Sequence, residues 1–154
     1  MGVLYIVIPL TDECSEWLRS ENVPHPAPAP ENRYPTPAEM AEALAKLSGY
    51  RAAVFKSLER GSWYADVTWA ADRMAAPGSM VCLHGYRSEH EPEQFYIDKG
   101  PIELALRIAA ILAARCGPLV VTADCDCIPV VVTAGADIGA LVQEREARLA
   151  SRCT

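Results

Sequence analysis

The segment from Lys99 to Thr133 constrains the fold more than any other part of this chain. Near its start lies Pro101, a residue favoured at the first helical position, and mostly apolar residues then run to Gly117, a common helix terminator. Two short apolar runs follow, separated by the residues 124–127. This pattern predicts a helix over 101–116 that leads into a pair of buried strands joined by a turn.

Short strands and helices are predicted on both sides of this segment. Thr36-Pro37-Ala38-Glu39 forms a capping box with proline at the first helical position, which predicts a helix over 37–47. Strands joined by short links favour an antiparallel meander. The sequence therefore predicts an α+β fold: a mainly antiparallel sheet, a meander of about four strands plus the two apolar strands, with helices packed on one face. The other predicted elements are a first strand (2–10), a helix (12–19), strands over 50–57, 62–69, 80–85 and 94–98, a connector over 70–78 and a last helix (137–151).

Alternation of apolar and polar residues assigns two faces to the meander strands. Successive side chains of an extended strand point to opposite faces of the sheet. One face is predicted to pack against the helices, and the other to carry polar and titratable side chains. The packed face comprises Trp63, Val67, Trp69, Val81, Leu83, Phe95 and Ile97, and the polar face comprises Tyr64, Asp66, Thr68, Cys82, His84, Gln94, Tyr96 and Asp98.

A single globular domain over 1–154 fits the length of the chain. Within it, residues 21–37 contain six prolines. Each proline ring fixes its own φ and restrains the residue before it, so an extended surface loop is predicted. An ordered strap across the surface and a mobile excursion are both left open.

The charge balance and the cysteines limit the classes of partner and the compartment. A net charge of −6 disfavours nucleic acid, whose phosphates require clustered lysine and arginine. The apolar start of the chain, roughly ten residues, is too short to span a bilayer and lacks the basic region of a signal peptide. Six cysteines without a sign of secretion are expected to be reduced thiols. We therefore expect a cytoplasmic protein with no membrane or nucleic-acid partner.

The polar face gathers groups that could perform acid–base or nucleophilic chemistry. Cys82 and His84 lie two apart on one strand, so they point the same way, but about 6.5–7 Å separates their bases. A small enzyme of unknown substrate is one alternative, and an ordinary solvated face is another. The common motifs for nucleotide, metal and serine-hydrolase sites are absent from the sequence, and no cofactor is predicted. The residues of the enzyme alternative are His84, Asp66, Tyr96 and Cys82.

Asp124-Cys125-Asp126-Cys127 is the most conspicuous local pattern. Two thiolates can bind a soft metal, but structural zinc sites usually place two to four residues between paired cysteines and need further ligands. Cys125 and Cys127 are therefore a weaker alternative, as a metal or redox site. A turn in which the aspartate side chains bond to the local backbone is the simpler interpretation.

A non-enzymatic binding module is the function that the sequence favours. Small acidic domains without catalytic motifs can bind and block a basic protein, as bacterial immunity proteins and inhibitors do. The expected contact residues are acidic or aromatic and lie in two loops. They are Glu89, Glu91, Glu93, Tyr34 and Tyr86. A homodimer is also left open.

Overall fold

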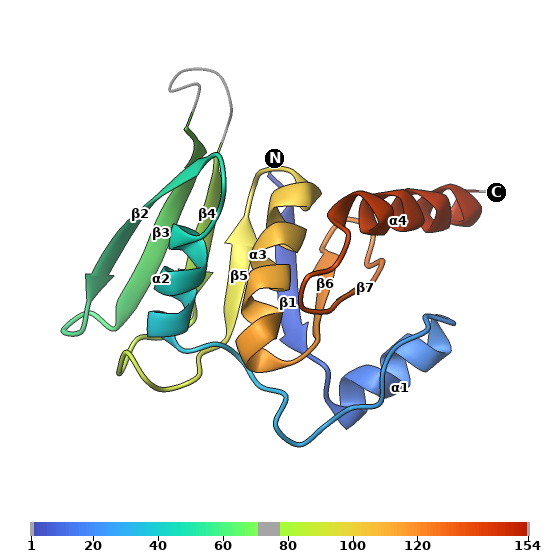
Figure 1. Ribbon diagram of the computed structural model, residues 1–154, viewed down its shortest axis with the longest axis horizontal. Coiled ribbons are helices and arrows are strands. Elements are labelled where there is room, and N and C mark those ends of the chain that lie inside the picture. Colours follow the sequence, from blue (N-terminus) through green and yellow to red (C-terminus); the bar gives the residue numbers. More distant parts are fainter. Residues whose placement is uncertain (1, 71–77, 154) are drawn as a thin grey trace.

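Seven strands form one sheet in the order β2-β3-β4-β5-β1-β6-β7 (Figure 1). The computed structural model describes residues 2–70 and 78–153, so the predicted connector over 70–78 lies largely outside the described residues. Every neighbouring pair of strands is antiparallel, and β2 to β5 form the predicted meander. The strands are β1 (Leu4–Pro9), β2 (Tyr50–Ser57), β3 (Ser62–Trp69), β4 (Ser79–Leu83), β5 (Phe95–Asp98), β6 (Leu119–Ala123) and β7 (Val130–Val132).

Helices begin where the local capping signals place them. The predicted capping box starts α2: Glu39 N donates to Thr36 Oγ1 (3.1 Å), and Thr36 N donates to Glu39 Oε1 (2.9 Å). The helix predicted over 101–116 begins one residue later, because Pro101 is its N-cap rather than its first helical residue. The α+β fold class is confirmed, and no helix among the described residues is both long and apolar enough to cross a membrane. The helices are α1 (Asp12–Ser20), α2 (Pro37–Ala45), α3 (Ile102–Cys116) and α4 (Ile138–Arg152).

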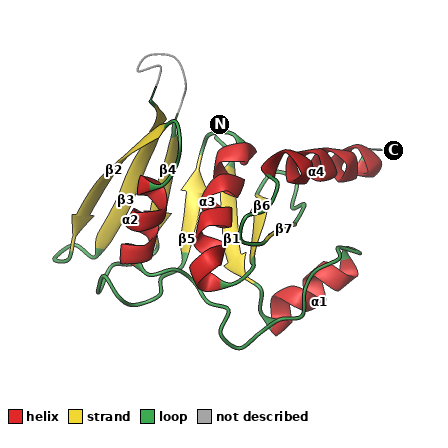
Figure 2. Cartoon of the chain, in the orientation of Figure 1, coloured by secondary structure: helices red, strands yellow, loops and turns green. Residues whose placement is uncertain are grey.

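The helices α2 and α3 pack on one face of the sheet, as predicted (Figure 2). The helix α1 lies over the far end of the other face. There Leu10 and Leu18 pack with Val120 and the partly buried Ile8, which are neighbours on β6 and β1. The rest of that second face, over β2 to β5, keeps accessible side chains.

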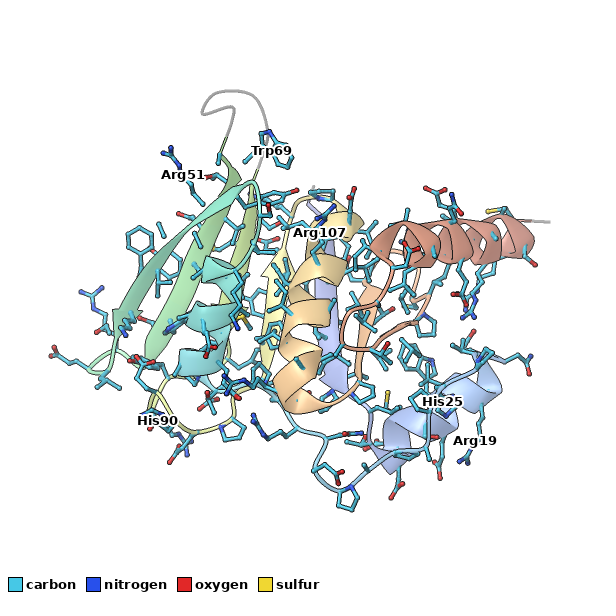
Figure 3. The ribbon with its side chains drawn as sticks, viewed as in Figure 1. Arg19, His25, Arg51, Trp69, His90 and Arg107 are labelled. Carbon is cyan, nitrogen blue, oxygen red and sulfur yellow. The ribbon has the colours of Figure 1, made fainter. Side chains whose placement is uncertain are left out.

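The predicted packed face is confirmed at every position except Trp69. Trp63 belongs to the main core and is 2% exposed, whereas Trp69 is 43% exposed. The Trp69 ring meets the ring of Tyr50 edge-on, with 4.8 Å between centroids. Trp69 has the predicted strand direction, but it is the last residue of β3 and lies at the far end of the sheet (Figure 3). The prediction that both tryptophans pack against the helices is therefore wrong for Trp69.

The Pro-rich segment over 21–37 is an ordered strap that crosses from α1 to α2. Arg33 N donates to Cys116 O at the end of α3 (3.1 Å). Glu93 N, in the loop before β5, donates to Pro35 O (2.9 Å). These bonds tie the strap to two elements that are distant in the sequence, so the ordered alternative is the one observed.

Candidate functional site

The face of the sheet turned away from α2 and α3 is accessible over β2 to β5, and we call it the open face (Figure 2). The predicted polar side chains lie on it, because the observed strand register follows the predicted alternation. Tyr64, Thr68, His84 and Gln94 are exposed, and Asp66, Cys82, Tyr96 and Asp98 are half-buried.

One row of side chains crosses five strands of the open face. Phe55 and Tyr64 stack at one end of this row, with 5.1 Å between ring centroids and 20° between ring planes. Phe55 is 47% exposed, and Tyr64 and Ile6 are each 38% exposed. Large apolar side chains that are exposed together form a surface that contacts another molecule more often than a solvated polar face does. We call this set the aromatic row; in order across the sheet it is Phe55, Tyr64, Cys82, Tyr96 and Ile6.

The adjacent row of the open face carries carboxylates. Asp66 and Asp98 lie on either side of Met80, two strands apart. Asp124 follows β6, and its Oδ1 accepts a hydrogen bond from Leu4 N (3.0 Å). We call Asp66, Asp98 and Asp124 the acidic row. It runs beside the aromatic row at about 7 Å, the spacing of alternate residues along a strand.

Tyr96 contacts two of the groups that the enzyme alternative requires. Its hydroxyl lies close to the Cys82 thiol, and its ring meets the His84 ring edge-on, with 5.4 Å between centroids. Burial raises the pKa of the Cys82 thiol, and the nearby Tyr96 hydroxyl offsets only part of that rise. A thiol that is protonated at neutral pH is a poor nucleophile, so this environment does not favour cysteine catalysis.

Asp66 and His84 lie far apart on the open face. Asp66 lies directly opposite Met80 on β4. His84 comes four residues after Met80, just past the end of the same strand. Four strand residues span about 13 Å, well beyond a hydrogen bond. Asp66 therefore neither orients His84 nor contacts it, and the set His84, Asp66 and Tyr96 does not form one acid–base unit.

Two shallow hollows lie along the open face, and both are open to solvent. One has a volume of about 420 Å³ and the other about 410 Å³. The first lies over Tyr64, Met80, Cys82 and His84, and the second over Ile8, Thr11, Trp17 and Tyr34. Both hollows are shallow and open, unlike the enclosed clefts that bury a small substrate, so the open face is better suited to a protein partner.

Two of the predicted contact residues take part in the fold itself. Tyr86 is buried, at 4% exposed, and its hydroxyl donates to Glu89 Oε1 (2.5 Å). Lys56 Nζ donates to the same oxygen (2.5 Å). The bonds from Lys56 and Tyr86 lower the pKa of the Glu89 carboxyl. Tyr86 and Glu89 thus fasten the loop after β4 to the edge strand β2.

The other three predicted contact residues keep some access to solvent. Glu91 is exposed and Glu93 is half-buried. Tyr34 is half-buried in the strap, and its hydroxyl lies close to the Gln94 side chain on the open face. Tyr34 therefore lies at the rim of the open face.

The residues 124–127 form the predicted turn between β6 and β7. Asp126 Oδ1 accepts a hydrogen bond from Ile128 N (3.0 Å), which confirms that an aspartate bonds to the local backbone. Cys125 and Cys127 are exposed thiols, not joined in a disulfide. Within residues 2–70 and 78–153, no three His, Cys, Asp or Glu side chains are grouped to hold a metal ion.

Two features of this surface were not predicted. Phe55 and Ile6 complete the aromatic row, and the only sequence signal for them is their alternate position in two apolar strands.

Near α1, Ser15 Oγ lies 2.7 Å from His25 Nε2, and His25 Nδ1 lies 2.8 Å from Val23 O (Figure 3). Because a carbonyl only accepts, Nδ1 carries a proton and donates to Val23 O. Ser15 is 1% exposed, so this contact fastens the strap to α1 rather than facing a substrate.

The fold and the open face together are the basis for a functional interpretation. Comparison of the chain with protein-family models, with curated proteins and with solved structures finds no match. Function must therefore be inferred from the chemistry of the open face.

Proposed function

We propose that this protein is a non-enzymatic binding module that docks a basic protein on its open face, in the manner of an immunity or inhibitor protein. The observation that supports this proposal is the aromatic row, which lies uncovered beside the acidic row. Single exposed apolar residues are common. A contiguous row of them beside a row of charges of one sign is typical of an interaction surface.

The two rows would have different roles in binding. Stacked aromatic side chains such as Phe55 and Tyr64 bury a large area at low entropic cost, so they would supply most of the affinity. Asp66 and Asp98 would attract lysine or arginine groups of the partner and speed the encounter. The net charge of −6 adds to this attraction.

The loop residues proposed from the sequence fit this surface in part. Tyr34 at the rim, with Glu91 and Glu93 beyond it, would extend the contact past the end of the sheet. The enzyme alternative has less support, because the Cys82 thiol has a raised pKa and Asp66 lies far from His84. We also propose a cytoplasmic location, which the six cysteines, none of them in a disulfide, support.

A capture experiment followed by variants tests this function. The partner would be cross-linked in cells of the native host, purified, and its affinity measured for three variants. Phe55→Ala with Tyr64→Ala should weaken binding at least tenfold, as loss of a hot spot does. Asp66→Asn with Asp98→Asn should slow association, and the difference should shrink as salt rises.

Glu103→Gln is the matched control, because Glu103 is an exposed acid on α3, behind the sheet from the open face. It should leave both affinity and association rate unchanged. Binding that is indifferent to the aromatic pair would contradict the proposal. Turnover of a small molecule that His84→Ala abolishes would replace it with the enzyme alternative.

A further inference from the structure

The edge strand β2 is the most exposed element of the sheet. All eight of its residues are exposed or half-buried, and Val54 and Phe55 are 38% and 47% exposed. The opposite edge strand, β7, has only three residues, and α4 lies against it with Leu141 and Arg145. A long edge with unpaired backbone groups and apolar side chains is a template for another strand.

The hydrogen-bond pattern shows which residues of β2 face outward. Ala70 N donates to Gly49 O (2.9 Å), so Gly49 and Ala70 are a hydrogen-bonded pair. The next pair along the two strands is Tyr50 and Trp69. In an antiparallel ladder, hydrogen-bonded and non-hydrogen-bonded pairs alternate. The odd-numbered residues of β2 therefore bond to β3. The even-numbered ones direct their backbone N–H and C=O to the outside: Tyr50, Ala52, Val54 and Lys56.

We propose that β2 pairs with β2 of a second copy of this chain, antiparallel about a two-fold axis at Ala53. Each side chain then stays on its own face of the sheet only if even-numbered residues pair with even-numbered ones and odd-numbered with odd-numbered ones. Centring on Ala53 sets Ala52 opposite the partner's Val54 and Tyr50 opposite the partner's Lys56. All four outward residues are then used, which gives about eight main-chain hydrogen bonds.

The side chains of β2 are complementary to themselves in this register. Arg51 lies opposite the partner's Phe55, and the two are on the same face of the sheet. A guanidinium over an aromatic ring is a favourable pair. Lys56 lies opposite the partner's Tyr50, and its ammonium already binds Glu89. Like charges never lie directly opposite one another. At the axis Ala53 lies opposite Ala53 of the second copy, where two larger side chains would clash.

A competing register centred on Val54 is less favourable. It uses three outward pairs, or about six hydrogen bonds, and sets Arg51 opposite the partner's Ser57. The contact between Arg51 and the partner's Phe55 is then lost. Arg51 is exposed at the end of β2 near Trp69 (Figure 3), where a second copy would reach it.

Proline and alanine substitutions at Val54 test the edge pairing. Val54 N–H points outward, so Val54→Pro removes a donor to the second copy while leaving the β2–β3 ladder intact. The unaltered protein should sediment as a dimer and Val54→Pro as a monomer with an unchanged circular dichroism spectrum. Val54→Ala keeps the N–H and should remain dimeric. A monomeric unaltered protein, or a dimeric Val54→Pro protein, would overturn the proposal.

Cysteine cross-linking tests the register even if Val54→Pro does not fold. In a background with Cys125, Cys127 and Cys153 changed to serine, Ala53→Cys should form an intermolecular disulfide with oxidised glutathione. The two Cα atoms at the axis would lie about 4.5 Å apart, within disulfide range. Ala52→Cys should not cross-link, because the two Cα atoms at position 52 would lie about 8 Å apart. Cross-linking through Val54→Cys in place of Ala53→Cys would overturn the register.

Discussion

Arg33 and Glu39 form a two-point ion pair, with Nη1 2.7 Å from Oε1 and Nη2 2.9 Å from Oε2. The same carboxylate accepts from Thr36 N in the capping box of α2. Arg33 N also donates to Cys116 O. Arg33 and Glu39, through their side chains and the Arg33 backbone, thus join the strap, the start of α2 and the end of α3.

The Arg33–Glu39 pair should make stability depend on pH. The hydrogen bonds from Arg33 lower the pKa of Glu39 from 4.5 to about 2. A carboxyl with a lower pKa in the folded state stabilises the fold above its unfolded pKa and loses that contribution as pH falls through the folded one. Glu39→Gln should therefore cost about 1–2 kcal/mol of unfolding free energy at neutral pH. The difference from the unaltered protein should fade between pH 4.5 and about pH 2.

Urea denaturation across this pH range measures the effect, with Glu42→Gln as the control. Glu42 lies on the same helix but is 45% exposed, and its ion pairs are on the surface. Its replacement should cost less than about 0.5 kcal/mol at any pH. A Glu39→Gln cost that stayed constant down to the lowest pH would contradict the linkage.

The two tryptophans of β3 should differ sharply in their contribution to stability. Trp63 is 2% exposed in the core, so Trp63→Ala should cost about 3–5 kcal/mol. Trp69 is 43% exposed and contacts Tyr50 edge-on, so Trp69→Ala should cost about 1 kcal/mol. Equilibrium unfolding of the two variants compares them directly. Equal costs would show that Trp69 is buried in solution.

Thiol reactivity should separate the cysteines by burial. Cys125 and Cys127 are exposed, whereas Cys116 is 1% exposed and burial raises its pKa to about 11. Timed alkylation with iodoacetamide, followed by mass spectrometry, should modify the turn thiols first and Cys116 last. In denaturant all six cysteines should react at similar rates. Early modification of Cys116 in the folded protein would contradict the observed packing.

Protein purified without a chelator is expected to carry no stoichiometric metal at the turn over 124–127. The gap of one residue between Cys125 and Cys127 does not match the common zinc sites. Elemental analysis checks this expectation. A zinc or copper signal that disappears in a variant with both Cys125→Ser and Cys127→Ser would revive the metal alternative.

Features encoded within a few residues could be predicted from the sequence. The capping box of Thr36 and Glu39 marked the start of α2, and both of its hydrogen bonds are present. The period of two in β3 assigned Tyr64 and Asp66 to the polar face. In each case the deciding interaction is local, so its residue pattern is visible without knowledge of the fold.

Features that depend on long-range pairing could not be predicted. The aromatic row needs β1 to lie beside β5, which brings Ile6 next to Tyr96 across ninety positions of sequence. Tyr86 likewise is buried in a core that includes Trp63 of β3 and Leu104 of α3, which are distant in the sequence. Alternation predicts on which face of the sheet a side chain lies, but not how far along the sheet the helices cover that face. This is why the prediction placed Trp69 in the core.

Asp126 and Arg145 show how α4 is attached to the sheet. Arg145 donates to Asp126 Oδ2, and both side chains are 12% exposed. Arg152 Nη1 donates to Asp126 O (2.9 Å), and Arg152 also pairs with Glu21 at the start of the strap. None of the α4 residues is fully buried, so polar contacts carry an unusual share of its attachment.

Breaking this pair should therefore loosen α4 more than any surface pair on the same helix. Arg145→Met leaves the Asp126 carboxylate nearly buried without its cation, which should cost about 3 kcal/mol and speed hydrogen exchange along α4. Adding Asp126→Asn removes the orphaned charge and should recover part of that loss. Arg148→Met is the control, because Arg148 pairs with Glu144 one turn away and should cost about 0.5 kcal/mol. If Arg145→Met and Arg148→Met destabilised α4 equally, the attachment would have to come from its apolar contacts instead.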